Sequence, residues 1–173
     1  RDPALAQRRI SEIHAEMARQ PALPVSPVLK SLDIDALLAA GQASQAVAVA
    51  QEGRNRFPLS RALVMREADA LLAAGRKGDA VALLRDQAQI YRQDAGVQRA
   101  LARAYAEQGK QALQHMALAE YYALTGALPA ALEQLRIARG SPDAGFYEQA
   151  MIDARERELQ ASWKDVMAQQ KRR

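Results

Sequence analysis

Few residues of this 173-residue chain have the types and spacing needed for acid–base or nucleophilic chemistry. The histidines His14 and His115 lie far apart in the chain, and neither precedes a second histidine by four positions. The HExxH pair of zinc proteases is therefore absent. No glycine-rich phosphate loop or G-x-S-x-G turn occurs, and the serines have no visible base partner. We expect this chain by itself to be neither an enzyme nor a holder of a cofactor or metal.

The carboxylates mostly alternate with arginines, as in "DARERELQ" at 153–160. On a helix surface Arg155 would lie near Glu158, and solvated pairs of this kind add only roughly a few tenths of a kcal/mol. His115 is expected to pack on or near a helix face. These charged residues therefore predict a hydrated surface.

Arg99 and Arg103 are better suited to binding, because they lie one helical turn apart. Two guanidinium groups on one face suit a carboxylate, such as a peptide terminus or an acidic side chain. The alternative is that they pair with Glu107 and Asp69 and only add solubility. The sequence leaves both interpretations open.

The composition predicts an almost entirely helical protein. Alanine, leucine, glutamine, glutamate and arginine dominate, and these residues lose little side-chain freedom in a helix. Cysteine is absent, and no apolar run is long enough to span a membrane. The 24 basic residues and 20 acidic residues are interleaved, so the formal charge of +4 does not indicate a nucleic-acid partner.

Glycines recur at an even interval that must reflect the arrangement of the helices. Gly41, Gly75 and Gly109 are equally spaced, and Gly126 follows after half that interval. An alanine stands five positions after three of them, at Ala46, Ala80 and Ala131, whereas Gln114 breaks the pattern. Each glycine would end a helix in the left-handed region, and each alanine would permit a tight helix crossing. The full interval, about 34 residues, and this pattern resemble the tetratricopeptide (TPR) repeat.

The resemblance implies an all-α solenoid of antiparallel helix pairs with about nine helices. We expect them near 3–19, 27–40, 43–57, 61–74, 77–92, 95–108, 111–125, 128–139 and 143–169. Asp2, Ser26 and Ser141, each followed by proline, are the expected N-caps. Tyr105, Tyr122, Leu84 and Leu135 occupy core positions of the motif. Trp163 is expected to anchor a C-terminal capping helix against the array.

In TPR arrays the first helix of each unit lines a concave binding surface. With Arg61, Ala95 and Ala112 as unit starts, the groove positions are Met65, Asp69, Leu72, Arg99, Arg103, Glu107, Met116, Glu120 and Leu124. The methionines would supply adaptable apolar contacts. We therefore predict a groove for a protein or peptide.

The C-terminal half also resembles the corresponding region of BepA-like periplasmic metalloproteases. The resemblance lies in Ala119-Glu120, Ala123-Leu124 and Gly126, followed by Asp153-Ala154-Arg155 and Leu159. The opening "DPALAQRRISEI" is similar to the segment that closes the family's catalytic domain, with Asp2 in place of the usual histidine. The resemblance implies two regions: 1–24, the end of a protease domain with a linker helix, and 25–173, a TPR domain with its capping helix.

The resemblance further implies a chain cut from a longer periplasmic protein of a Gram-negative bacterium. Its catalytic domain, with HExxH and zinc, is expected upstream of Arg1. Such proteins degrade stalled outer-membrane β-barrel proteins or assist their assembly. The expected partners are the barrel-assembly machinery, unfolded outer-membrane proteins and the parent's own protease domain. Two alternatives stay open: a cytosolic TPR adaptor that binds a short peptide tail, and a structural protein that self-associates.

Overall fold

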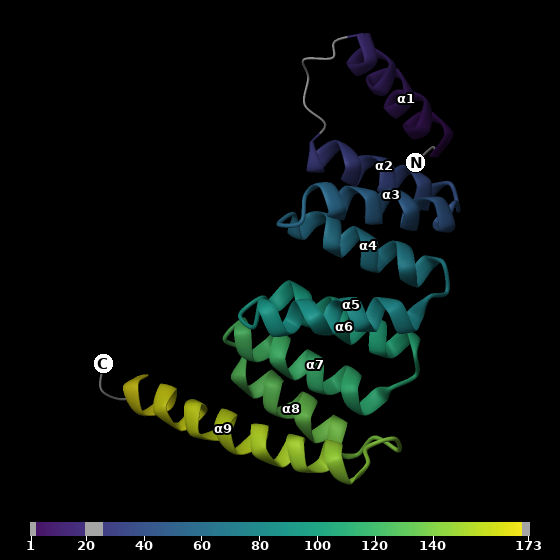
Figure 1. Ribbon diagram of the computed structural model, residues 1–173. Helices are drawn as coiled ribbons and strands as arrows, with labels where there is room; N and C mark the ends of the chain where they lie inside the picture. Colours follow the sequence, from purple (N-terminus) through teal and green to yellow (C-terminus); the bar gives the residue numbers. More distant parts are fainter. Residues whose placement is uncertain (1–2, 20–25, 171–173) are drawn as a thin grey trace. The chain divides into compact units, whose positions relative to one another are not determined.

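The computed structural model describes residues 3–19 and 26–170, and in this part of the chain all regular structure is helical (Figure 1). The helices are α1 Pro3–Arg19, α2 Pro27–Ala39, α3 Ala43–Arg56, α4 Arg61–Ala73, α5 Lys77–Ile90, α6 Ala95–Glu107, α7 Gln111–Leu124, α8 Leu128–Arg139 and α9 Phe146–Gln170. The all-α prediction with about nine helices is therefore confirmed for the described residues, and consecutive helices pack against one another from α1 to α4 and from α6 to α9.

One expected boundary is wrong. α9 begins at Phe146 instead of residue 143, and Ser141 does not cap it. The Ser141 hydroxyl instead donates to the carbonyl of Ile137 at 3.1 Å, so it belongs to the end of α8. The cap at Ser26 is confirmed, because its Oγ accepts from the Leu29 amide at 3.2 Å. Asp2 lies outside the described residues.

The four turn glycines adopt one conformation. Gly41, Gly75, Gly109 and Gly126 have φ of 74°, 75°, 73° and 80°. These values lie in the left-handed region expected at a helix C-terminus. After each glycine, the next amide bonds back into the helix, as from Gln42 to the Leu37 carbonyl at 2.8 Å. The alanines five positions on, Ala46, Ala80 and Ala131, have no exposed surface, so the predicted hairpin geometry is confirmed.

The chain divides into two compact units, residues 1–83 and 84–173. In unit 1, α4 packs against both α2 and α3, and α1 contacts α2. Ile34, Val47, Leu63 and Leu71 fill its core together with the small residues Ala46, Ala50, Ala70 and Ala80. The linker expected near residues 19–27 falls mostly on residues outside the described ranges, so the predicted boundary at residue 24 stays a prediction.

In unit 2, α7 packs between α6 and α8, and α9 contacts both α8 and α7. Ile152 and Leu159 anchor α9 in a core with Ala131 and Leu135. Trp163 is half-buried and is not part of this core, so it is not the anchor that we expected. Leaving one edge of Trp163 exposed costs little free energy. Ile152 and Leu159, earlier in α9, fit closely among small residues of α7 and α8 and therefore anchor the helix.

Candidate functional site

Unit 2 contains a pocket of about 270 Å³ where α6, α7, α8 and α9 meet, here called the α7 pocket. Its lining residues are Gln98, Leu101, Tyr105, Leu113, Met116, Ala117, Glu120, Leu135, Met151 and Arg155. Most of these side chains are apolar, and the charged ones are Glu120 and Arg155. A pocket with this lining can hold an apolar side chain and orient it by a few polar groups.

An ion pair between α9 and α7 forms the polar edge of the pocket. Arg155 Nε and Nη2 each lie 2.7 Å from one carboxylate oxygen of Glu120. This arrangement is bidentate. Arg155 Nη1 also donates to Glu158 at 2.7 Å. Burial alone would lower the pKa of Arg155, but the hydrogen bonds that it donates to Glu120 and Glu158 outweigh this effect and raise that pKa. Arg155 therefore stays charged and holds α9 against α7 through Glu120.

Tyr105 forms part of the α6 wall and is buried. Burial raises the pKa of its phenol above the usual value, and the nearby Arg85 guanidinium offsets part of this effect. The hydroxyl is therefore neutral over the physiological pH range and can donate or accept a hydrogen bond. The core position predicted for Tyr105 is confirmed, and the residue also contributes to the pocket.

Arg99 borders the α7 pocket without lining it. Its Cζ lies 5.8 Å from the centroid of the Tyr121 ring. This separation is within the range of a cation–π contact. Arg99 and Tyr121 each follow a lining residue directly in the chain, Gln98 and Glu120. Within the described ranges no carboxylate forms an ion pair with Arg99, which is exposed to solvent, so its charge is available to an incoming group.

The predicted groove residues fall in both units, three in unit 1 and six in unit 2, and a groove shared by them stays a prediction. Of the three in unit 1, Leu72 packs against the core, Asp69 lies 3.5 Å from Arg66, and Met65 is half-buried. In unit 2, only Met116 and Glu120 line the α7 pocket. The others lie elsewhere on their helices: Arg99 beside the pocket, Arg103 and Glu107 exposed on α6, and Leu124 half-buried at the end of α7.

Sequence reasoning missed the α9 side of the pocket, formed by Met151 and Arg155. Their spacing of four positions places them on one helical face, which the sequence does show. Their role required knowing that α9 folds back onto α7 and brings Arg155 to Glu120. That pairing joins residues 35 positions apart, and no local pattern indicates it.

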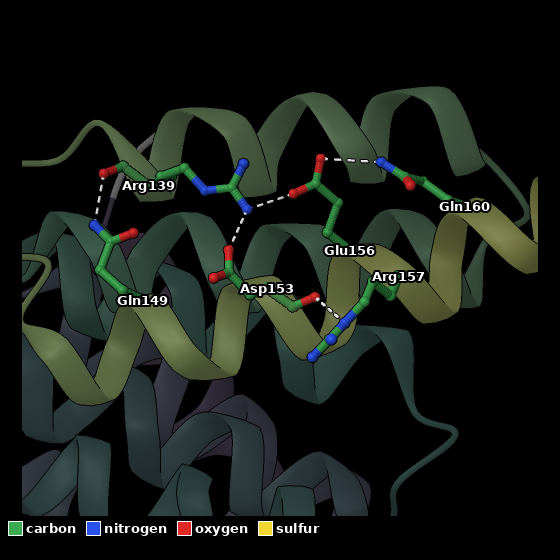
Figure 2. Close-up of polar contacts among 6 residues, drawn as sticks. All are labelled: Arg139, Gln149, Asp153, Glu156, Arg157 and Gln160. Carbon is green, nitrogen blue, oxygen red and sulfur yellow. Dashed lines mark hydrogen bonds and ion pairs between the residues drawn. The ribbon is translucent and has the colours of Figure 1, made fainter.

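A second polar cluster joins the end of α8 to α9 (Figure 2). Arg139 Nη2 donates hydrogen bonds to Glu156 and Asp153, and these two bonds, the one to Glu156 first, raise the pKa of Arg139. Gln149 donates to the Arg139 carbonyl at 2.9 Å. A polar cleft of about 310 Å³ is lined by Arg139, Asp153 and Glu156 together with Arg157 and Gln160. Because Arg139 occupies both carboxylates, we interpret this cluster as a structural clamp on α9.

His115 connects α7 to α8, with Nδ1 2.8 Å from Gln134 Oε1. This contact agrees with the expectation that it packs within the helices. Across 3–19 and 26–170, no group of three or more histidine, aspartate or glutamate side chains is arranged to hold a metal ion. The described helices also include none that is both long and apolar enough to cross a membrane. No protein-family model matches the chain, and no curated protein matches it.

Proposed function

We propose that this chain is a TPR-type protein-binding domain and that the α7 pocket is its recognition site. The observation that carries the proposal is the pocket itself, an apolar hollow edged by an ion pair and bordered by the exposed cation Arg99. These groups can bind and orient a chain, but they contain no nucleophile with an adjacent base. Helical-repeat proteins use such surfaces to hold partner proteins.

The expected ligand is a segment that carries a bulky apolar side chain next to a carboxylate. The side chain would enter between Leu101 and Met151, and Met116 on the pocket floor would adapt to its shape. The carboxylate would pair with Arg99, whose guanidinium is already oriented by the Tyr121 ring. Arg103, one turn further along α6, would add positive charge to that side.

We propose that the parent is a periplasmic zinc metalloprotease or chaperone of the BepA-like kind. Support comes from the motifs Ala119-Glu120, Ala123-Leu124 and Asp153-Ala154-Arg155. Two residues in these motifs, Glu120 and Arg155, form the interhelical ion pair, so the motif supplies an interaction that shapes the pocket. In such a protein the domain would recruit the barrel-assembly machinery or misassembled barrel proteins to a zinc site on another part of the chain.

A cytosolic adaptor for a short peptide tail is the second candidate. The exposed Arg99 favours it, because a chain terminus supplies a carboxylate directly beside its last side chain. The compartment distinguishes the two proteins: a signal peptide and an HExxH motif upstream of Arg1 in the gene would support the periplasmic parent and exclude the adaptor.

The pocket is tested with Met151→Glu, which places a charge at the apolar edge. Met151 is 42% exposed, so the substitution leaves the fold intact. The probe is a fluorescently labelled, urea-unfolded outer-membrane β-barrel protein diluted into the domain, with binding followed by anisotropy. We expect Met151→Glu to weaken binding roughly tenfold or more, because an apolar anchor would lose its contact.

The matched control is Ala150→Glu, which adds the same charge at a neighbouring exposed position that does not line the pocket. Equal loss in both variants would indicate a general charge effect and exclude the pocket as the site. No binding by the wild-type domain, together with binding of an acidic tail peptide, would favour the adaptor.

A further inference from the structure

The last helix is much longer than the helices that support it. α9 has 25 residues, whereas α7 has 14 and α8 has 12. At about 1.5 Å per residue, α9 is about 37 Å long and α7 about 21 Å. Leu159 is the last buried residue of α9, and the segment 160–170 projects beyond α7 and α8 as about three turns of helix (Figure 1).

The apolar face of α9 continues along this projecting segment. Ile152 and Leu159 are buried against α7 and α8, and Trp163, Val166 and Met167 follow at spacings of four, three and one positions. These intervals keep all five side chains on one helical face. Val166 and Met167 remain 36% and 37% exposed, and Trp163 is half-buried. The face that buries the first half of α9 therefore remains uncovered in the second half.

We propose that the uncovered face, formed by Trp163, Val166 and Met167, is a self-association surface covered by the same segment of a second copy of this chain. The argument is continuity with the contact already present: the same face packs on helices along Ile152 and Leu159. A second copy presents a projecting helix with an identical face, which suits an isologous two-fold contact.

The two segments would pack antiparallel. Each α9 carries the bulk of its unit at its N-terminal half, so a parallel pair would force two bodies into the same space. The antiparallel pair places the bodies at opposite ends and sets Trp163 of each copy against Val166 and Met167 of the other. Gln160 and Ser162, which border the face most closely, are uncharged, whereas Lys164 lies further around the helix, about as far from the face as Gln169.

A contact of about three helical turns is smaller than the roughly 1,200–2,000 Å² of standard interfaces. The expected dimer is therefore concentration-dependent, with a Kd of roughly tens to hundreds of micromolar. Sedimentation of the full chain from about 1 μM to about 1 mM should show association over this range. The mass should rise from 18.9 kDa toward twice that value. Trp163, which is the one tryptophan of the chain, should shift its emission to shorter wavelength over the same range.

Met167→Glu should weaken this association roughly tenfold or more, because it places a charge in an apolar contact. Ala161→Glu adds the same charge on the opposite, exposed side of the segment and should leave the dimer unchanged. Circular dichroism verifies that both variants stay helical. The proposal is overturned by a wild-type chain that stays monomeric, by equal dimerisation of Met167→Glu, by equal loss in both variants, or by assemblies larger than a dimer. Ligand binding at the α7 pocket is measured below the dimer range, so the two proposals fail independently.

Discussion

The two units are built from the same helix–turn–helix hairpin but differ in what surrounds their interhelical ion pairs. In unit 1, α4 packs against α2 and α3 together, and its Glu67 is 3% exposed beside Arg54. In unit 2, α9 packs against α7 and α8, and Glu120 is about one-third exposed beside Arg155. The two ion pairs have similar chemistry, but Arg54 and Glu67 do not line the pocket of about 360 Å³ in unit 1, whereas Glu120 and Arg155 edge the α7 pocket.

This difference shows that a helix position alone does not determine whether a side chain is available to a partner. Met65 and Met116 occupy equivalent predicted groove positions, four residues after Arg61 and Ala112. Met65 is half-buried in unit 1, whereas Met116 lines the pocket of unit 2. The neighbouring helix decides the outcome, because it either fills the space over the side chain or leaves a hollow beside it.

Truncating a core leucine in each unit should give the largest difference. Leu63 is fully buried and lies close to Gly53 of α3, whose missing Cβ would be 3.4 Å from its methyl groups. Leu63→Ala should cost about 3–5 kcal/mol, because the cavity cannot collapse. Leu135→Ala should cost about 2–3 kcal/mol, since water from the adjoining pocket can fill the space. Urea unfolding of the full chain measures both, and equal costs would contradict the contrast between a leucine away from the pockets and one that lines the α7 pocket.

Removing the carboxylate of each ion pair should also lower the free energy of unfolding more in unit 1 than in unit 2, but by smaller amounts than the leucine truncations. Glu67→Ala should cost about 2–3 kcal/mol, because it strands a guanidinium against the buried side of α4 although Arg54 keeps some water. Glu120→Ala should cost about 1 kcal/mol or less, because both members of the pair are exposed enough to be hydrated and Arg155 retains Glu158. Unfolding in about 1 M salt serves as the control, since salt should reduce the cost of the Glu120 change more. A larger effect at Glu120 would reverse the comparison.

Most of the fold could be predicted from the sequence because its determinants are local. A glycine at Gly41 or Gly126 ends its helix through its own backbone, and an alanine five positions later reports a tight crossing in the same hairpin. The error at Ser141 is also local: a serine before proline fits a cap, but its hydroxyl can equally bond back to the carbonyl four positions earlier.

The site could be predicted only in part, because it depends on contacts between distant segments. Met116 and Glu120, two of the predicted groove residues, line the α7 pocket, but the pattern could not show that α9 would supply Met151 and Arg155. Arg99, predicted to bind a carboxylate, also lies 5.8 Å from the Tyr121 ring, a contact between α6 and α7 that no spacing indicates. Such cross-helix pairings depend on packing angles, which small changes in side-chain volume can alter.

The turns should behave identically in both units and give the smallest effect. Gly41 and Gly126 have φ of 74° and 80°, where an L-residue is strained. Gly41→Ala and Gly126→Ala should therefore each cost about 1–2 kcal/mol. No atom lies within 4 Å of the Cβ added at either position, so the cost is conformational and independent of the surrounding core. Urea unfolding measures the two values.

Gly78→Ala in α5 is the matched control, since that position also has no atom within 4 Å of the added Cβ but has no positive φ. The same substitution should there stabilise the chain by about 0.5 kcal/mol, because alanine favours the helix. Opposite signs at Gly126 and Gly78 would attribute the cost to the left-handed backbone itself. Unequal costs at Gly41 and Gly126 would instead mean that the hairpins differ in their turns as well as in their packing. The contrast between the units would then arise from the turns too, and not only from the packing of α4 and α9.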